Sequence, residues 1–381
     1  MQLRLVVSRS ERKDWVRFPR LHVYPSDSPW VAPLDRDVLR MLDSRKNPFF
    51  RHGEAETYLA VDRQGEVAGR VLAHVYHRHT TRHDERAAFF GYFECRDDVD
   101  AARCLIEGAK AFGSRRGCTI LRGPFNMTAM QEMGTLVEGF DEAPAIDETY
   151  TAPYYPALLE AAGLTPVFPH ATFRVDELGA VDVDALLTDR HRAQLESGRV
   201  RIRAADSKHY DREFETLREL LNDSFYNNPH FVPITDAEFE FQIGPFKRLM
   251  DPAISLVAEL DGVPCGFIIA IPDYNLALRG MKGRMGPLEI VHFLLKRSKI
   301  HDACLIIMGV HRQLQGKGLM RIMQAELVRA LRSRGYNRLT ITWIAEVNDK
   351  SLATVRALGA HPVHRLTLYD CPLGAAGGTG G

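Results

Sequence analysis

The stretch "MGVHRQLQGKGLM", residues 308–320, lies between an apolar run, "ACLIIMGV", and a helix-patterned run, "LMRIMQAELVRALRSRG". Its two glycines, Gly316 and Gly318, stand where a strand is expected to turn into a helix. Glycine lets the backbone approach a ligand closely, and a helix start offers unpaired amides and the positive end of the helix dipole. The stretch is therefore either a phosphate-binding loop or a tight turn that needs glycine.

Two common phosphate-binding patterns do not fit this stretch. A dinucleotide fingerprint requires a third glycine three residues after the second, where the chain has Arg321, and a P-loop requires Ser or Thr where it has Gly318. An apolar stripe predicts the helix that follows, and Gly335 is expected to end it. The stripe consists of Leu319, Ile322, Met323, Leu327, Ala330 and Leu331.

The chain contains an internal duplication, because residues 3–75 echo residues 200–272 in the order of their features. Each half begins with a short strand and a helix, continues through a Pro-containing loop into a second helix, and then forms a β-hairpin. The halves also end alike, in "YYPALLEAAGLTPVFPHATFRV" and "SLATVRALGAHPVHRLTLYDC". The sequence therefore predicts two copies of one α/β unit.

The domain boundaries follow from this duplication. We expect a first domain over 1–176, a linker over 177–198, a second domain over 199–373 and a tail over 374–381. The tail, "GAAGGTGG", is almost only Gly and Ala, so it is expected to be disordered.

Composition excludes several classes of function. Lys plus Arg and Asp plus Glu number 49 each in 381 residues, so no global basic field would attract nucleic acid. No apolar run approaches the roughly 18 residues of a membrane span, and the start of the chain lacks a signal-peptide core. The six cysteines form no CxxC pair and are interpreted as buried free thiols. These features predict a cytoplasmic protein.

The pattern Gln313-x-x-Gly316-x-Gly318 after an apolar strand, followed by a helix, a strand and "NDKSLATVRALG" from Asn348, resembles the core of the GNAT acyltransferase superfamily. The resemblance runs through residues 254–370. It implies an α/β (α+β) fold of two tandem GNAT-like domains, each with a mixed, mostly antiparallel sheet flanked by helices. Phrases such as "SPWVAPLDRDVL", "KNPFF", "RGPFN" and "WIAEVND" resemble bacterial ceramide synthase-like N-acyltransferases more weakly.

The resemblance implies that acetyl-CoA or a longer acyl-CoA is the donor. We expect no metal to take part. The loop amides would hold the pyrophosphate, and the strand at 303–310 would pair with the pantetheine arm. The implied cofactor-binding residues are Met308, Val310, Gln313, Leu314, Gln315, Gly316, Lys317, Gly318, Asn348 and Ser351.

The first half has a different sequence in the matching place. After "AAFFGYF" come four carboxylates and no glycine, namely Glu94, Asp97, Asp98 and Asp100. Negative charges repel a pyrophosphate, and side chains crowd its approach. The first copy is therefore expected to lack a cofactor site and to shape the acceptor pocket.

An amine that attacks a thioester needs a base near neutral pKa. Glu346 is the first candidate, with helix capping as its alternative role. The tyrosine that the family uses as an acid is replaced by Val355, so the acid is expected to be Tyr369 or Tyr226, or the thiolate leaves unassisted. Asp273 is a weaker candidate base.

Acceptor contacts are expected from the loop at 222–235, which occupies the place where GNAT proteins vary with their substrate. Its polar candidates are Tyr226 and His230, although a single loop histidine is more often a surface residue than a ligand. Asn275, at the end of the hairpin, is a further candidate.

A histidine-rich stretch, "HVYHRHTTRHDE", has its histidines at 74, 77, 79 and 83. Alternate positions of a strand point to opposite faces, so this spacing does not favour a metal site. It is interpreted as a polar loop.

Between the second hairpin and "ACLIIMGV" lies an insertion of about 28 residues that a simple GNAT domain does not need. It contains "PLEIVHFLL" flanked by basic residues. It is either a buried packing helix with a solvated basic end, or an interfacial segment that makes peripheral contact through 286–299 at the inner membrane face.

The leading hypothesis is a CoA-thioester-dependent N-acyltransferase in which a primary amine attacks directly. In the more specific form of this hypothesis, the enzyme transfers a fatty acyl group to a sphingoid-type lipid amine. An acetyltransferase of a small soluble amine or peptide, and a non-catalytic acyl-CoA-binding protein, are the alternatives.

Overall fold

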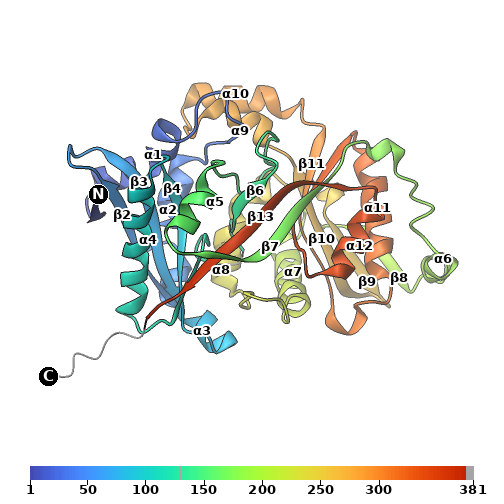
Figure 1. Ribbon diagram of the computed structural model, residues 1–381. Coiled ribbons are helices and arrows are strands. Elements are labelled where there is room, and N and C mark those ends of the chain that lie inside the picture. Colours follow the sequence, from blue (N-terminus) through green and yellow to red (C-terminus); the bar gives the residue numbers. More distant parts are fainter. Residues whose placement is uncertain (129, 375–381) are drawn as a thin grey trace. The chain divides into compact units, whose positions relative to one another are not determined.

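The computed structural model describes residues 1–128 and 130–374 (Figure 1), so most of the tail that was predicted to be disordered lies outside the described residues. The described residues form two compact units. Unit 1 holds residues 1–170, 277–295 and the chain from His364, and unit 2 holds residues 171–276 and 296–363. The predicted domain boundaries follow the duplication instead, and they stay a prediction.

Unit 1 is built on an antiparallel sheet with one parallel pair. Its strands run in the order β1-β2-β3-β4-β5, β4 and β5 are parallel, and the last part of β13 pairs with β5 and β6. Its elements are β1 (Gln2–Leu5), α1 (Arg9–His22), α2 (Asp35–Met41), β2 (Gly53–Val61), β3 (Val67–Tyr76), α3 (His77–His83), β4 (Ala87–Cys95), α4 (Val99–Ser114), β5 (Ile120–Gly123), β6 (Thr135–Glu138) and α5 (Tyr155–Ala161).

Unit 2 repeats this plan. Its strands run in the order β8-β9-β10-β11-β12, and β11 and β12 are parallel. Its elements are α6 (Asp189–Glu196), β8 (Val200–Ala204), α7 (Tyr210–Ser224), α8 (Asp236–Ile243), β9 (Leu256–Leu260), β10 (Val263–Pro272), β11 (Asp302–Val310), α11 (Leu319–Ser333), β12 (Arg338–Ala345) and α12 (Asp349–Arg356).

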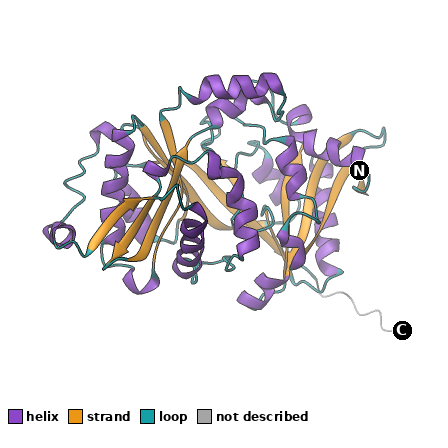
Figure 2. Cartoon of the chain, turned by 180° about the vertical axis from the view of Figure 1, so that it is seen from behind, coloured by secondary structure: helices purple, strands orange, loops and turns teal. Residues whose placement is uncertain are grey.

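Four elements depart from a simple division of the chain. Strands β7 (Thr165–Val175) and β13 (His361–Pro372) contribute residues to both units. The insertion forms α9 (Asn275–Met281) and α10 (Pro287–Arg297), most of which belongs to unit 1 although it follows β10 of unit 2. Figure 2 shows the purple helices against the orange strands in each unit. The predicted α/β fold with two copies of a mostly antiparallel sheet is confirmed.

Helix α11 packs on the sheet of unit 2 through the stripe that the sequence predicts. Leu319, Ile322, Met323 and Leu327 are buried, and Gly335, at φ 78°, follows the helix end. This packing fixes the start of α11 directly after the loop that ends β11, which is the position of the two glycines.

The interpretation of the histidine-rich stretch as a polar loop is wrong. His74 lies in β3 and is fully buried, and residues 77–83 form helix α3. The ring of His79 is also buried and packs edge-on against Phe89 at a centroid distance of 5.0 Å. Burial lowers the pKa of His74 to about 4. His74 and His79 act here as packing rings, which their polarity in the sequence conceals.

The prediction of free thiols is confirmed, since all six cysteines are unbridged. The buried ones are Cys95, Cys265, Cys304 and Cys371. Cys104 and Cys118 are only partly buried, so the expectation of burial holds for four of the six.

Candidate functional site

The two parallel strands of unit 2 separate toward their carboxyl ends. Only the first four residues of each strand pair among the described residues, although both strands continue beyond them. The hydroxyl of Thr342 donates to the carbonyl oxygen of Leu305 at 3.2 Å where the strands part. A bulge at Ile306 interrupts the register with β10. The hydroxyl of Thr342 also lies 3.4 Å from the carbonyl oxygen of Ile306, so the edge of β11 at Ile307 and Met308 is available to a ligand that carries its own amides.

Helix α11 begins without a side-chain cap. Gly318 is its N-cap residue at φ 90°, and Gly316 has φ 76°. Throughout the described residues, no hydrogen-bond acceptor meets the amides of Gly316, Gly318, Leu319 or Met320. Unpaired amides at a helix start, with the positive end of the dipole behind them, attract phosphate groups. The loop can therefore receive a pyrophosphate.

Side chains of the loop hold it to helix α7. The Nε2 of Gln315 donates to the carbonyl oxygens of Val310 at 3.0 Å and Ser224 at 3.1 Å. The Nε of Arg312 donates to the carboxylate of Asp223 at 2.9 Å. The amide of Gln315 is thus engaged with the protein's own backbone, so this side chain supports the shape of the loop.

The other predicted cofactor residues surround the same loop. Gln313 and Lys317 are exposed, and Leu314 packs its partly buried side chain against the core of unit 2. Val310 is buried, and Met308, which is partly buried, pairs with β10. The lysine is the cation in this group, and its exposure leaves it able to reach a phosphate.

A residue of the predicted linker also borders the loop. Helix α6 places the imidazole of His191 against Gly318, where an added Cβ would lie 2.2 Å from Nε2. The Nδ1 of His191 accepts a hydrogen bond from the amide of Thr188 at 3.3 Å, which fixes the orientation of the ring. Burial lowers the pKa of His191, and the positive charges of Arg321 and Arg190 lower it further. The only sequence signal was a capping pattern in which histidine replaces the usual Glu or Gln.

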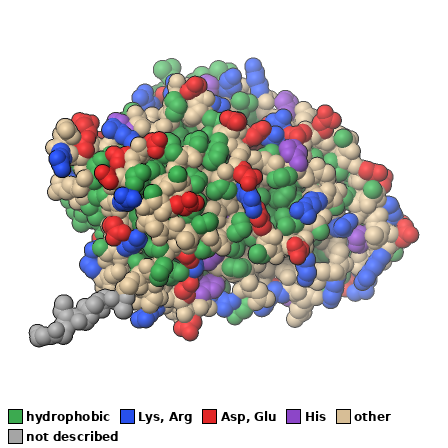
Figure 3. Space-filling model, in the orientation of Figure 1, with side chains coloured by type: hydrophobic (Ala, Val, Ile, Leu, Met, Phe, Trp, Pro, Cys, Tyr) green, Lys and Arg blue, Asp and Glu red, His purple; other side chains and the backbone are tan. Residues whose placement is uncertain are grey.

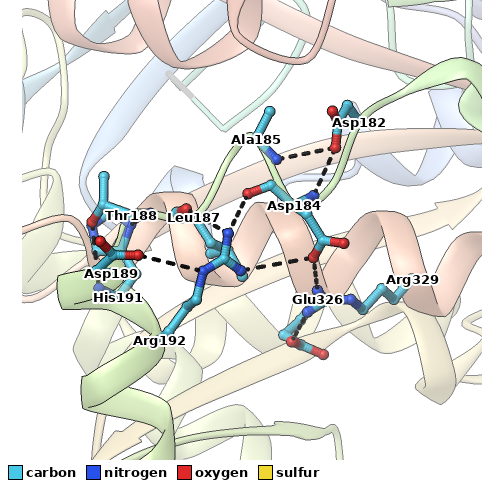
Figure 4. Close-up of polar contacts among 10 residues, drawn as sticks. All are labelled: Asp182, Asp184, Ala185, Leu187, Thr188, Asp189, His191, Arg192, Glu326 and Arg329. Atoms are coloured by element: carbon cyan, nitrogen blue, oxygen red, sulfur yellow. Dashed lines mark hydrogen bonds and ion pairs between the residues drawn. The ribbon is translucent and has the colours of Figure 1, made fainter.

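Hydrogen bonds fix the segment before α6 to helix α11 (Figure 4). Arg192 donates to the carbonyl oxygens of Asp184 at 2.9 Å and Leu187 at 3.1 Å. The carboxylate of Asp184 also accepts from Arg329 at 3.3 Å, and Arg329 donates to Glu326 at 2.6 Å. This network ties the segment that carries His191 to the helix whose start forms the loop.

The matching helix of unit 1 is closed by its own cap. Asp98 is the N-cap residue of α4, and its Oδ1 accepts from the amide of Ala101 at 3.0 Å. The carboxylate occupies the place where a phosphate would meet the helix start. Glu94, in contrast, points into the core, where its Oε2 accepts from the hydroxyls of Tyr155 at 2.6 Å and Tyr24 at 3.0 Å.

The matching strand edge of unit 1 is also occupied. After the parallel pair β4–β5, the amide of Phe125 donates to the carbonyl oxygen of Phe90 at 2.6 Å. The Oδ1 of Asn126 accepts from the amide of Tyr92 at 2.7 Å. The chain itself fills the gap that stays open in unit 2.

The predicted catalytic residues lie in different places. Glu346, which is partly buried, follows β12 at the carboxyl end of the parted strands. The cap of the next helix is Asn348, whose Oδ1 accepts from the amide of Ser351 at 3.1 Å, so Glu346 does not act as the cap. Tyr369 lies in the core of unit 1, where burial raises its pKa to about 12.

The predicted acceptor residues lie in two segments of unit 2. Tyr226 follows helix α7 and stacks under the guanidinium of Arg312 at 4.5 Å, and His230 has φ 63°. Asp273 accepts from the amide of Asn275 at 3.0 Å, at the start of α9. The carboxylate of Asp273 is therefore engaged with the backbone at the start of α9.

Comparison with known proteins identifies relatives of the whole chain. The model of the acetyltransferase (GNAT) family matches residues 214–360. "Bacterial ceramide synthase" of Caulobacter vibrioides (strain NA1000 / CB15N) is 30% identical over 373 residues, which are 96% of this chain and 96% of that protein. "Protein YghO" of Escherichia coli (strain K12) is 28% identical over 376 residues, or 97% and 94% of the two chains.

A solved structure shares the tandem arrangement. A tandem GNAT protein from the clavulanic acid biosynthesis pathway has a TM-score of 0.54 at 15% identity and covers 98% of each chain. This likeness concerns the fold alone, whereas the matched family model and the relative at 30% identity are similarities of sequence. The chain belongs to the GNAT family and is a tandem GNAT N-acyltransferase.

Proposed function

We propose that unit 2 transfers a fatty acyl group from coenzyme A to a sphingoid-type lipid amine. One observation carries the assignment of the cofactor: α11 begins with unpaired amides beside parted strands, whereas the matching helix of unit 1 is capped by Asp98. The lipid acceptor is supported by the relative whose name is bacterial ceramide synthase. In this proposal unit 2 alone binds the thioester.

The loop around Gly316 and Gly318 binds the pyrophosphate, and the free edge of β11 pairs with the pantetheine arm. The amine attacks the thioester carbonyl directly, so no covalent enzyme intermediate forms. Glu346 accepts a proton from the amine, directly or through water, which contributes about 10² to 10⁴ in rate. The thiolate leaves without the tyrosine acid that the family uses, because Val355 stands in its place.

Calorimetric titration with palmitoyl-CoA tests the cofactor assignment. Gly316→Asp places a carboxylate among the loop amides and should abolish binding. Gly335→Asp is the matched control, because Gly335 also has a positive φ and open surroundings but lies beyond the far end of α11. Equal affinities of wild type and Gly316→Asp would disprove the site.

Turnover of acetyl-CoA and palmitoyl-CoA with a long-chain base, a small soluble amine and a peptide tests the substrates. We expect turnover with palmitoyl-CoA and the long-chain base, and Glu346→Gln should bind CoA normally but react at least about 10²-fold more slowly. Turnover confined to acetyl-CoA and a soluble amine would favour the acetyltransferase alternative. Acyl-CoA binding without any turnover would favour a non-catalytic protein.

The proposed acceptor resides in a membrane, so the enzyme has to reach one. We include in the proposal a peripheral contact at the inner membrane face through residues 286–299.

A further inference from the structure

Helix α10 presents an apolar stripe to solvent. No residue of this helix is buried, so it is not the packing helix that one interpretation of the sequence predicted. Leu288, Val291, Leu294 and Leu295 follow the i, i+3, i+6, i+7 spacing of a single helix face. Leu288 is 83% exposed and Leu295 is 67% exposed. An exposed apolar stripe of this kind indicates a surface that binds another apolar surface.

The polar side chains of α10 hold the helix in place. Glu289 accepts from the amide of Gly286 at 3.0 Å at the start of the helix. The ring of His292 packs against Gly280 of α9, where an added Cβ would lie 2.0 Å from Nε2. These contacts orient Glu289 and His292 away from the stripe, so the apolar residues face outward on a supported helix.

The loop between α9 and α10 is anchored to unit 1. The amide of Asp35 donates to the carbonyl oxygen of Gly283 at 2.9 Å, and Arg20 donates to the carbonyl oxygen of Lys282 at 2.9 Å. Arg279 donates to the carbonyl oxygen of Ser28. Residues 277–295 of the insertion are thus a fixed part of this unit, and their exposed face is a defined surface.

Basic residues surround the stripe. Residues 279–299 hold six Lys and Arg and a single carboxylate, in a chain whose formal net charge is zero. No ion pair among the described residues involves the side chains of Lys282, Arg284, Lys296 or Lys299. Green side chains and blue cations lie together along the upper rim in Figure 3, where Figure 1 places α10. The positive charge of this region is therefore available to an anionic partner.

We propose that the α9–α10 insertion docks onto an anionic lipid bilayer, with the stripe of α10 in the interface and its cations at the head groups. An 11-residue helix spans about 16 Å, half of a hydrocarbon core, so α10 would lie in the interface. No helix among the described residues is long and apolar enough to cross a membrane. A second copy of the chain is a poorer partner for this surface, because the basic residues around the two stripes would repel each other. The proposal does not depend on the identity of the acceptor.

Co-sedimentation of the full chain with vesicles, without substrate, tests the docking. Wild type should bind vesicles of phosphatidylcholine with 30% phosphatidylglycerol, and binding should fall at least about tenfold on pure phosphatidylcholine. Leu288→Asp/Leu295→Asp and Lys296→Glu/Lys299→Glu should each reduce binding to the anionic vesicles at least about tenfold. These side chains are not buried, so both variants should retain the wild-type melting temperature.

Val263→Asp and Lys13→Glu are the matched controls, because both residues are exposed on other elements, β10 and α1. Both should bind like wild type. Three results would overturn the proposal: wild type that does not bind anionic vesicles, binding that the α10 variants retain, or a solution dimer that Leu288→Asp/Leu295→Asp dissociates. Calorimetry with palmitoyl-CoA on the same variants should give wild-type affinity, which separates a failure of docking from a failure of the proposed function.

Discussion

The imidazole of His191 occupies the space that a side chain at Gly318 would need, because an added Cβ would lie 2.2 Å from Nε2. The histidine comes from α6, and the glycine is the N-cap of α11. Gly318 therefore meets two requirements, a positive φ and a close neighbour, whereas Gly316 meets only the first. The two glycines should respond differently to the same substitution.

Gly318→Ala should destabilise the protein more than Gly316→Ala. At either position, an alanine in the left-handed backbone conformation destabilises the folded protein by about 1–2 kcal/mol. At 318 the clash with His191 adds to this cost, so the free energy of unfolding in urea should fall by at least about 1 kcal/mol more. Equal losses would show that His191 does not restrict this position, and the double variant Gly318→Ala/His191→Gly should recover the part due to the clash.

Binding of coenzyme A should raise the pKa of His191. In the free protein burial holds this pKa below the ordinary 6.5, with help from Arg321 and Arg190. A pyrophosphate at the start of α11 would add negative charge beside the ring and favour the imidazolium. NMR titration of the ring, assigned with His191→Gln, measures the change.

Pantetheine is the control ligand for this titration, because it shares the arm of coenzyme A but lacks the pyrophosphate. It should leave the pKa of His191 unchanged. A pKa that saturating coenzyme A does not move would place the pyrophosphate elsewhere.

The sequence was sufficient to predict the two copies, the stripe of α11 and the glycine loop, since each depends on local spacing. It could not reveal His191, because more than 120 residues separate this histidine from Gly318 and only the tertiary fold brings them together. It also could not show that Phe125 and Asn126 close the strand edge of unit 1. The sequence does not predict the helix at 77–83, because its buried residue is His79, which packs against Phe89 and leaves no hydrophobic pattern.

Gln315→Ala should weaken binding of coenzyme A more than Gln313→Ala. The side chain of Gln315 makes two hydrogen bonds that hold the loop to Val310 and Ser224, each worth about 1 kcal/mol. Its loss should lower the affinity measured by calorimetry about tenfold, whereas the exposed Gln313 should cost less. A larger loss of affinity for Gln313→Ala than for Gln315→Ala would contradict this. It would mean that Gln313 contacts the ligand, as the resemblance to the family implies.

Asp98→Ala should destabilise unit 1 without creating a second cofactor site. Loss of an N-cap costs about 1 kcal/mol, and Asp100→Ala, in the same helical turn but not at the cap, should cost less. Calorimetry should still give one coenzyme A per chain, because Phe125 and Asn126 continue to fill the strand edge. A stoichiometry of two would show that the carboxylate alone had closed the first copy.

The buried pair of His364 and Glu148 should make stability depend on pH. The Nδ1 of His364 lies 2.8 Å from Oε1 of Glu148, and both side chains are buried. Burial opposes the charged imidazole, but the hydrogen bond and charge of Glu148 outweigh it and raise the pKa of His364 above the ordinary 6.5. A histidine whose pKa is raised on folding stabilises the protein fully below its unfolded pKa, and this contribution is lost as pH rises through the folded pKa.

His364→Gln should therefore lower the free energy of unfolding at pH 6 by about 2 kcal/mol, and the difference from wild type should shrink toward pH 9. His361→Gln is the matched control, because His361 lies on the same strand and pairs with Asp176 at 2.6 Å but is exposed. An exposed pair contributes at most about 1 kcal/mol, so this variant should show a weaker dependence. Urea unfolding at pH 6, 7.5 and 9 measures both, and a pH-independent effect of His364→Gln would mean that the imidazole is neutral in the folded protein, with Glu148 bonded to its N–H alone.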